Sequence, residues 1–216
     1  MGTIGLADAL IVAGLRYGSD EAMAFTSRVF KLLNEATYGA SIKLGEERGS
    51  FPLFDAEQYG RGSFIQELPA DLQLDIQQKG IRNAFLTSQA PTGTIAKLAG
   101  VSEGIEPYFD RTTILKNRLG THTVDAPDSP YLVTANEVTP EQHIGMMAAA
   151  QVHVDSAVSK TVNAPEDQPV EETDKVYRLA YGMGLKSVAY YRDMSRGVQV
   201  AYHGATTCET VGGKCD

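Results

Sequence analysis

Residues 90–94 (APTGT) carry the residue types of an anion-binding turn. They follow a strand-like run and precede an apolar, helix-like segment that ends at Gly100. The proline favours extended backbone before it, the glycine lets a ligand approach the backbone closely, and either threonine can cap the helix. Free N–H groups at the positive end of that helix would then face a negatively charged ligand. The same residue types also serve turns that only cap a helix, so both interpretations stand at this point.

The two cysteines, Cys208 and Cys215, both lie in the last nine residues of the chain, with six residues between them. Exposed cysteine pairs in a reducing compartment are typically redox-active or metal-binding, so the pair predicts thiol–disulfide exchange. Two other interpretations stay open: an idle pair of thiols, or a zinc site to which His203 contributes. Three ligands at irregular spacing fall short of a four-ligand structural zinc site.

Tyr190 and Tyr191 are adjacent at the end of a strand-like run. Because consecutive strand residues point to opposite faces, the plain interpretation places one ring in the core and the other on the opposite side. The sequence contains neither GxGxxG nor GxxxxGK[ST], and no serine or threonine has a recognisable base. The histidines show no spacing typical of metal ligands: His122, His143, His153 and His203. The motifs therefore give no support to a hydrolase, a Rossmann dinucleotide site or a nucleotide-triphosphatase loop.

The composition is that of a soluble globular protein. With 43% hydrophobic and 21% charged residues and no long apolar run, the sequence excludes disordered, collagen-like and membrane-spanning classes. Its 216 residues suffice for one large or two small domains with a sizeable core. The net charge of −8 argues against a broad surface for nucleic acid. Since no signal-peptide pattern is visible, we expect a cytoplasmic protein with no nucleic-acid or membrane partner.

Helical patterns occupy much of the first third of the chain. The apolar run over residues 4–15 predicts a first helix, and Ser19 predicts the N-cap of a second. Apolar residues at steps of three and four predict the buried stripe of this second helix: Ala22, Phe25, Val29, Leu32 and Ala36. Residues 55–80 are polar with scattered glycine and proline, so they predict an excursion over the surface.

The middle of the chain predicts a strand, a loop and a helix. Residues 83–89 predict the strand before the APTGT turn, and residues 110–137 predict a long loop. The sequence Thr-Pro-Glu-Gln at residues 139–142 is a capping box with proline at the first helical position. We expect one face of that helix to continue as far as Thr161.

The last third predicts a helix and two strands. The helix buries one face and has Gly184 as its C-cap, the face being formed by Val176, Leu179, Ala180 and Met183. Strands are predicted over residues 186–191 and 198–202. This alternation of helix and strand predicts an α/β architecture, and the small polar residues at 204–216 predict a flexible tail.

Several motifs, in order along the chain, resemble the catalytic chains of ribonucleotide reductases. The stretch APTGTIAKLAGVSEGIEPYF at 90–109 resembles the substrate-phosphate loop of this family and is most similar to the adenosylcobalamin-dependent class II. Two matching stretches follow: QVHVDSAVSKTVNAP at 151–165 and VYRLAYGMGLKSVAYYRDMSRGVQV at 176–200. Two more precede it: IGLADALIVAGLRYGSDEA at 4–22 and ERGSFPLFD at 47–55. The resemblance covers nearly the whole chain.

The resemblance implies that the chain is the C-terminal part of a reductase large chain. Residues 1–203 would form the C-terminal part of a ten-stranded α/β barrel, and residues 204–216 would form a flexible redox tail. The family's asparagine–cysteine–glutamate constellation, whose cysteine becomes a thiyl radical, lies upstream of the matched region. We therefore expect the chain to be inactive alone. With an N-terminal fragment, and with adenosylcobalamin bound mainly by that fragment, it would reduce ribonucleotides to deoxyribonucleotides for DNA synthesis.

The resemblance also implies roles for individual residues. Backbone amides and hydroxyls would hold the nucleotide phosphates along the loop formed by Ala90, Pro91, Thr92, Gly93, Thr94 and Ile95. Cys208 and Cys215 would reduce the active-site disulfide and then be reduced by a thioredoxin- or glutaredoxin-like protein. Tyr190 and Tyr191 resemble the radical relay of class I chains, whose radical arises in a separate metal-containing subunit. A class I fragment is therefore one alternative, and a non-catalytic nucleotide-binding module is another.

Overall fold

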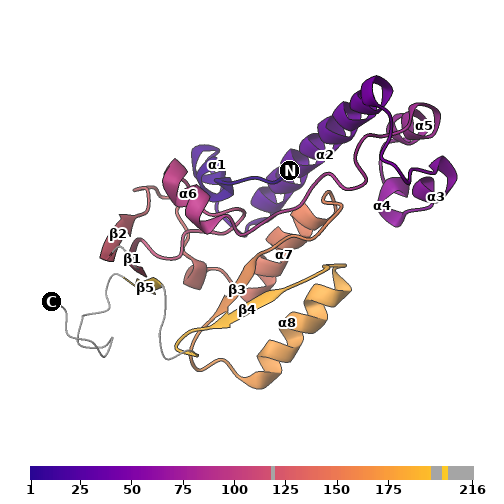
Figure 1. The fold of residues 1–216 in the computed structure, drawn as a ribbon. Helices are drawn as coiled ribbons and strands as arrows, with labels where there is room; N and C mark the ends of the chain where they lie inside the picture. Colours follow the sequence, from indigo (N-terminus) through magenta and orange to yellow (C-terminus); the bar gives the residue numbers. More distant parts are fainter. Residues whose placement is uncertain (118–119, 196–200, 204–216) are drawn as a thin grey trace.

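The computed structural model describes residues 1–117, 120–195 and 201–203 (Figure 1). Its helices are α1 (Leu6–Val12), α2 (Asp20–Arg48), α3 (Ala56–Gly60), α4 (Ser63–Gln66), α5 (Ala70–Lys79), α6 (Gly93–Ala99), the 3₁₀ helix η1 (Ala135–Glu137), α7 (Pro140–Gln151) and α8 (Val170–Gly182). Its strands are β1 (Thr112–Asn117), β2 (Gly120–Asp125), β3 (Thr161–Ala164), β4 (Ala189–Arg192) and β5 (Ala201–His203). These described elements form an α/β structure with two small sheets and no closed barrel.

A layer of parallel backbone segments runs through the middle of the molecule. Strands β3 and β4 pair in parallel, with Thr161 opposite Ala189. The layer continues on the other side of β3, where Gln89 N–H donates to Ala157 O (3.1 Å) and Ser159 N–H donates to Gln89 O (2.8 Å). The expected strand over residues 83–89 is thus an extended segment, in which only Gln89 forms a bridge, to Val158.

A further segment lies beyond residues 86–89. The Met1 amino group donates to Leu86 O (2.5 Å), and Ser88 N–H donates to Met1 O (2.9 Å), which is the bonding pattern of a parallel pair. Four segments therefore lie side by side with the same direction: 1–3, 86–89, 156–164 and 189–192. Their carboxyl ends meet at one edge, which is where ligands bind in parallel α/β sheets.

Three apolar clusters hold this layer to the helices. The largest joins α1, the first half of α2 and α7, and includes Leu10, Phe30, Ile105 and Met147. Another joins α7, β3 and α8 through Ile144, Val162, Val176 and Ala180. Helices α7 and α8 accordingly lie beside the β3–β4 pair (Figure 1).

The remaining cluster shows that the expected surface excursion over residues 55–80 is wrong. That segment forms α3, α4 and α5, which gather at the far end of α2 (Figure 1). Ile65, Leu68 and Ile76 are buried there against Tyr38 and Ile42 of α2. The apolar residues are spread over three short helices, so no single periodic stripe marks them in the sequence.

Helix α2 begins as predicted but buries a different face. The Ser19 side chain accepts a hydrogen bond from Ala22 N–H, which confirms the N-cap. The buried residues recur every four positions, and Leu32 of the predicted stripe is 67% exposed. The buried stripe is Ala22, Thr26, Phe30, Asn34 and Tyr38. It contains Thr26 and Asn34, which a hydropathy pattern assigns to the solvent side.

Helix α7 has the predicted capping box and the predicted proline, but it ends earlier than expected. The Gln151 amide donates to Val154 O and Ser156 O, both at 3.0 Å, and its oxygen accepts from Val158 N–H (3.1 Å). These bonds fold residues 152–158 into a turn, so Thr161 belongs to β3 and not to a helix face. Helix α8 ends at Gly182, and the predicted cap Gly184 follows with a φ of +72°.

The segment over residues 110–137, predicted as a loop, contains strands. β1 pairs antiparallel with β2 and with β5, which gives the sheet order β2-β1-β5. The strand predicted over 186–191 is present as β4, shifted toward the C-terminus. Of the strand predicted over 198–202, residues 201 and 202 lie in β5, and residues 198–200 lie outside the described residues. The predicted tail over residues 204–216, with Cys208 and Cys215, also lies outside the described residues.

Candidate functional site

The predicted anion-binding loop lies at the carboxyl end of the extended segment 86–89 and leads into α6. Ala90, Pro91, Thr94 and Ile95 are exposed, whereas Ala96 is fully buried and fixes α6 to the body of the protein. The first N–H groups of a helix have no partner within that helix, so this turn presents backbone donors at the surface. The structure therefore brings the loop residues together on one exposed turn.

The expectation that Thr92 or Thr94 caps α6 is wrong. Thr92 occupies the N-cap position with a φ of +58°, in the left-handed region, and no side chain caps this helix. In this conformation its hydroxyl reaches back and donates to Pro91 O (2.7 Å). The strained threonine is thus held by the turn that precedes it, and the helix amides keep their hydrogen-bonding capacity.

The start of the loop is fixed by the buried amide of Gln89. Its Oε1 accepts from Thr3 N–H (2.9 Å) and from the Thr3 hydroxyl (2.8 Å). Its Nε2 donates to Thr3 O (2.8 Å) and Ala90 O (3.0 Å). Both donors and the acceptor of this amide are satisfied, so residues 1–3 and the first residue of the loop hold one geometry.

Residues 102–106 form the floor beneath the loop. Gly104 has a φ of +49°, and a Cβ there would lie 3.1 Å from both Ala90 O and Gln89 Nε2. Only glycine allows this close approach without displacing a neighbour. The floor is bonded to α1, because Leu6 N–H donates to Gly104 O (3.3 Å) and Asp8 Oδ2 accepts from Ser102 N–H (2.7 Å).

Asp8 anchors this floor as a carboxylate. Burial opposes its charge, but hydrogen bonds from Ser102 and from the Tyr108 hydroxyl (2.7 Å) outweigh burial and lower the pKa of Asp8. Burial, together with the same contact, raises the pKa of Tyr108 above its usual value. The α1 helix thus holds the chain on both sides of residues 104–106.

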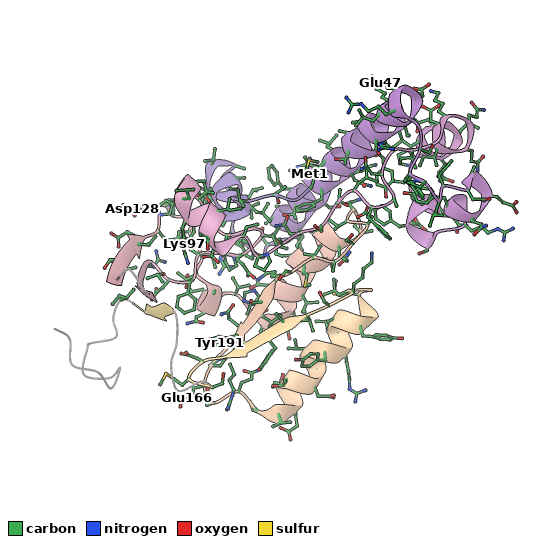
Figure 2. All side chains as sticks on the ribbon, in the orientation of Figure 1. Met1, Glu47, Lys97, Asp128, Glu166 and Tyr191 are labelled. Carbon is green, nitrogen blue, oxygen red and sulfur yellow. The ribbon has the colours of Figure 1, made fainter. Side chains whose placement is uncertain are left out.

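The charges beside the loop come as an exposed ion pair. Lys97 of α6, labelled in Figure 2, contacts Glu103 with 3.1 Å between Nζ and Oε1. A Cβ on Gly93 would lie 3.2 Å from Glu103 Oε2, so this carboxylate is next to the loop. The loop therefore has both a cation and an anion at its mouth.

A buried polar cluster lies below the floor, and the sequence interpretation missed it. The Lys160 ammonium is fully buried and has three acceptors: Glu106 Oε2 (2.9 Å), His143 Nδ1 (2.7 Å) and Thr161 O (3.0 Å). An ammonium has three N–H donors, so all of them are used. The other oxygen of Glu106 accepts from Thr161 N–H (2.6 Å). We call Glu106, His143 and Lys160 the buried triad.

The protonation states of the buried triad follow from its contacts. A carbonyl can only accept, so His143 Nε2 donates to Ala135 O (3.1 Å) and Nδ1 accepts from Lys160. Burial and the Lys160 charge lower the pKa of His143 to about 3. Burial lowers the pKa of Lys160, and the Glu106 carboxylate opposes that shift. The triad thus pairs a lysine cation with a carboxylate beside a neutral imidazole.

The tyrosine pair lies at the carboxyl end of the parallel layer. The Tyr190 ring packs on the α7–β3–α8 cluster, and its hydroxyl lies 3.0 Å from the Thr173 hydroxyl. The Tyr177 ring is 6.3 Å away between centroids. Tyr191 is half-buried on the neighbouring position of β4. Tyr190 therefore has the packed position that the plain interpretation gives one member of the pair.

A cavity of about 500 Å³ opens where β3 and β4 end and α7 begins. Glu166 and Tyr191 lie at this end of the sheet (Figure 2). Its lining is rich in carboxylates: Glu137, Glu141, Glu166, Glu172 and Asp193. Among the residues that the structure describes, no group of three or more His, Cys, Asp or Glu is placed to hold a metal ion.

One comparison decides the family. The family model described as "Ribonucleotide reductase, barrel domain" matches residues 1–127 and 115–191. The chain belongs to the ribonucleotide reductase barrel family. The resemblance drawn from its motifs is thereby confirmed.

Relatives of the chain include vitamin B12-dependent enzymes. The vitamin B12-dependent ribonucleoside-diphosphate reductase of Mycobacterium tuberculosis (strain H37Rv) is 32% identical over 95% of the chain and 32% of the relative. The enzyme of the same name from Thermoplasma acidophilum is 31% identical over 97% of the chain and 30% of the relative. The ribonucleoside-diphosphate reductase subunit alpha of Treponema pallidum is 27% identical over 90% of the chain and 24% of the relative. The chain spans about a third of the length of the relatives it matches or less.

The structure positions some of the predicted site residues and not others. It gathers residues 90–95 on one turn and puts Tyr190 and Tyr191 at the same edge of the parallel layer. It says nothing of Cys208 and Cys215. No regular spacing in the sequence indicates the buried triad, since Lys160 lies 17 positions from His143 and 54 from Glu106. The sequence signal for the triad is His143, which shares a helix face with the apolar Met147 and Ala150.

Proposed function

We propose that this chain supplies the substrate-phosphate loop of a ribonucleotide reductase, with residues 90–95 holding the phosphates of the ribonucleotide. The observation that carries the proposal is the position of this loop, at the carboxyl end of a parallel layer in a chain of the reductase barrel family. The left-handed Thr92 and the amide of Gln89 hold the turn in one geometry. A phosphate there would meet backbone N–H groups without first reorganising the protein.

The reaction in this proposal is the reduction of the 2′-carbon of the ribose. The C2′–O bond breaks, a C2′–H bond forms and the oxygen leaves as water, while two thiols supply two electrons and become a disulfide. The radical cysteine that starts this chemistry belongs to an N-terminal partner in our proposal. Together with that partner, the four parallel segments would complete a ten-stranded α/β barrel, which the length of the relatives supports.

Adenosylcobalamin is the cofactor that the vitamin B12-dependent relatives suggest for the assembled enzyme. The carboxylate-lined cavity of about 500 Å³ is of a size usual for drug-like ligands and does not fit a corrinoid. We therefore assign the cofactor to the N-terminal partner and derive no step of the reaction through it in this chain. A class I enzyme with a separate radical subunit is the alternative, and in it Tyr190 and Tyr191 would relay the radical.

Cys208 and Cys215 are the proposed shuttle between the active site and an external reductant. In this division residues 1–203 form the barrel part and residues 204–216 the redox tail. A thioredoxin- or glutaredoxin-like protein would reduce the pair, which goes with a reducing, cytoplasmic location. No helix among the described residues is long and apolar enough to cross a membrane. We expect Cys208→Ser to abolish turnover with thioredoxin and to leave turnover with a small dithiol, and equal activity with both reductants would refute the shuttle.

The function is tested by assembling the chain with an N-terminal reductase part, adenosylcobalamin, a ribonucleoside diphosphate and a dithiol. We expect deoxynucleotide to form only when both protein parts are present. A parallel assembly replaces adenosylcobalamin with a class I radical subunit, and the component that turnover requires identifies the class. An assembled complex that binds nucleotide but forms no deoxynucleotide with either component would favour the non-catalytic nucleotide-binding module.

A further inference from the structure

The buried triad lies between the strand β3 and the floor of the proposed phosphate loop. Lys160 directly follows Ser159, whose N–H donates to Gln89 O at the end of segment 86–89. Its side chain reaches Glu106, the last residue of the floor. One residue thus connects the loop's own strand with the segment beneath the loop.

Glu106 is bound at two points to the start of β3, namely Thr161 and the preceding Lys160. One oxygen accepts from the Lys160 ammonium (2.9 Å) and the other from Thr161 N–H (2.6 Å). The Glu106 backbone N–H donates to Glu103 O (2.8 Å), which closes the turn that carries Gly104. A displacement of Glu106 therefore moves Gly104, and Gly104 has almost no free space against Ala90 O and Gln89 Nε2.

The Tyr17 side chain, which lies beside the Lys160 ammonium, also fixes the floor. The ammonium lies 5.6 Å from the centre of the Tyr17 ring, and the Tyr17 hydroxyl donates to Ile105 O (2.5 Å). Ile105 itself is fully buried. Residues 104, 105 and 106 are consequently each held by a different part of the protein: the loop and α1, the Tyr17 hydroxyl, and the Lys160 ammonium.

We propose that Lys160 is a positioning residue for the substrate-phosphate loop, acting through Glu106 and Gly104 on the backbone of Ala90 and Pro91. Lys160 does not contact the substrate. Removal of its ammonium leaves Glu106 as an uncompensated, largely buried carboxylate, which relaxes toward solvent and takes the floor with it. The inference rests on the proposed function, since it explains how the loop keeps the geometry that phosphates require.

The test uses the assembled reductase and steady-state kinetics with a ribonucleoside diphosphate. The loop holds phosphates equally in the ground state and the transition state, so its displacement raises KM and leaves kcat nearly unchanged. We expect Lys160→Met to raise KM about tenfold with kcat within about twofold of the wild type. A proportional loss of kcat, or an unchanged KM, would overturn the positioning role.

A matched control separates positioning from loss of stability. Ile76 is fully buried in the cluster at the far end of α2, so Ile76→Ala destabilises the chain without touching the floor. We expect its KM to equal that of the wild type at a temperature where both proteins are folded. If KM rises as much in Ile76→Ala as in Lys160→Met, the rise is due to lost stability, and Lys160 does not position the loop.

Gly104→Ala provides a second route if Lys160→Met does not fold. The added Cβ presses on Ala90 O directly, so we expect the same rise in KM. In the double variant the two effects should be smaller than additive, because both displace the same floor. Full additivity would contradict the pathway. If the wild-type complex forms no deoxynucleotide, the proposed function fails; if it does and both variants keep the wild-type KM, only the present inference fails.

Discussion

The loop over residues 90–95 and the buried triad beneath it are opposites in how they are held. The loop is exposed except at the half-buried Thr92 and Gly93. The Thr92 hydroxyl donates to the adjacent Pro91 carbonyl, and the neighbouring ion pair Lys97–Glu103 is exposed. In the triad, Lys160 and His143 are fully buried and Glu106 is mostly buried, and every N–H of the ammonium has an acceptor. In our proposal, therefore, the geometry of the loop depends on residues distant in the sequence, which fix the floor beneath it.

The largest expected effect separates the two ion pairs. Lys160→Met leaves Glu106 without its partner and should lower the free energy of unfolding by about 3–5 kcal/mol. Lys97→Met breaks the exposed pair beside the loop and should cost about 0–1 kcal/mol. Urea unfolding of the two variants measures both values. Equal losses would mean that the triad is no better held than the loop surface.

A smaller effect concerns the pH dependence of stability. The pKa of His143 is about 3 in the folded chain, against about 6.5 when unfolded. The unfolded state therefore binds a proton that the folded state excludes, so this contribution is complete above pH 6.5 and is lost as the pH falls toward 3. The expected slope reaches about 1.4 kcal/mol per pH unit.

Unfolding of His143→Gln between pH 7 and pH 5 measures this contribution, and we expect its slope to be smaller than that of the wild type. His153→Gln is the control, because His153 is half-buried and contacts the Ser27 hydroxyl (2.9 Å). Its removal should flatten the profile less. A wild-type slope that His143→Gln leaves unchanged would show that the folded chain binds a proton on this imidazole as readily as the unfolded chain does.

The smallest effect tests the strain in the loop. Thr92 has a φ of +58°, where glycine is free of the steric cost that a side chain incurs. We expect Thr92→Gly to relieve about 1 kcal/mol of backbone strain. The loss of the hydrogen bond to Pro91 O offsets up to the whole of this gain, so the free energy of unfolding should rise or stay the same. Thermal unfolding measures the sign. A clear destabilisation would mean that the hydroxyl contact, and not the backbone, fixes the turn.

Local signals predicted the ends of elements well. Ser19 and the Thr139–Gln142 capping box begin their helices as expected, because a cap depends on residues three positions apart. The APTGT turn was also predicted from adjacent residues, although the Thr92 side chain does not cap the helix. The family was predicted from several motifs that occur in the order typical of the family, and the match to the family model confirmed it.

Contacts between distant residues escaped prediction. Within the buried stripe of α2, Thr26 satisfies its hydroxyl by donating to Ala22 O (2.8 Å), a bond that hydropathy does not register. Helices α3 to α5 looked like surface because their apolar residues meet only around the far end of α2. The buried triad joins α7, β3 and the loop floor, so no spacing within one segment encodes it.

The most direct test of the central claim is the affinity of the assembled reductase for a ribonucleoside diphosphate, measured by equilibrium dialysis with and without Thr92→Ala/Thr94→Ala. The loop account predicts weaker binding by about tenfold, since both hydroxyls and the fixed turn are lost. The Ile76→Ala variant should bind as the wild type does. An unchanged dissociation constant in the double threonine variant would contradict the assignment of residues 90–95 to the phosphates.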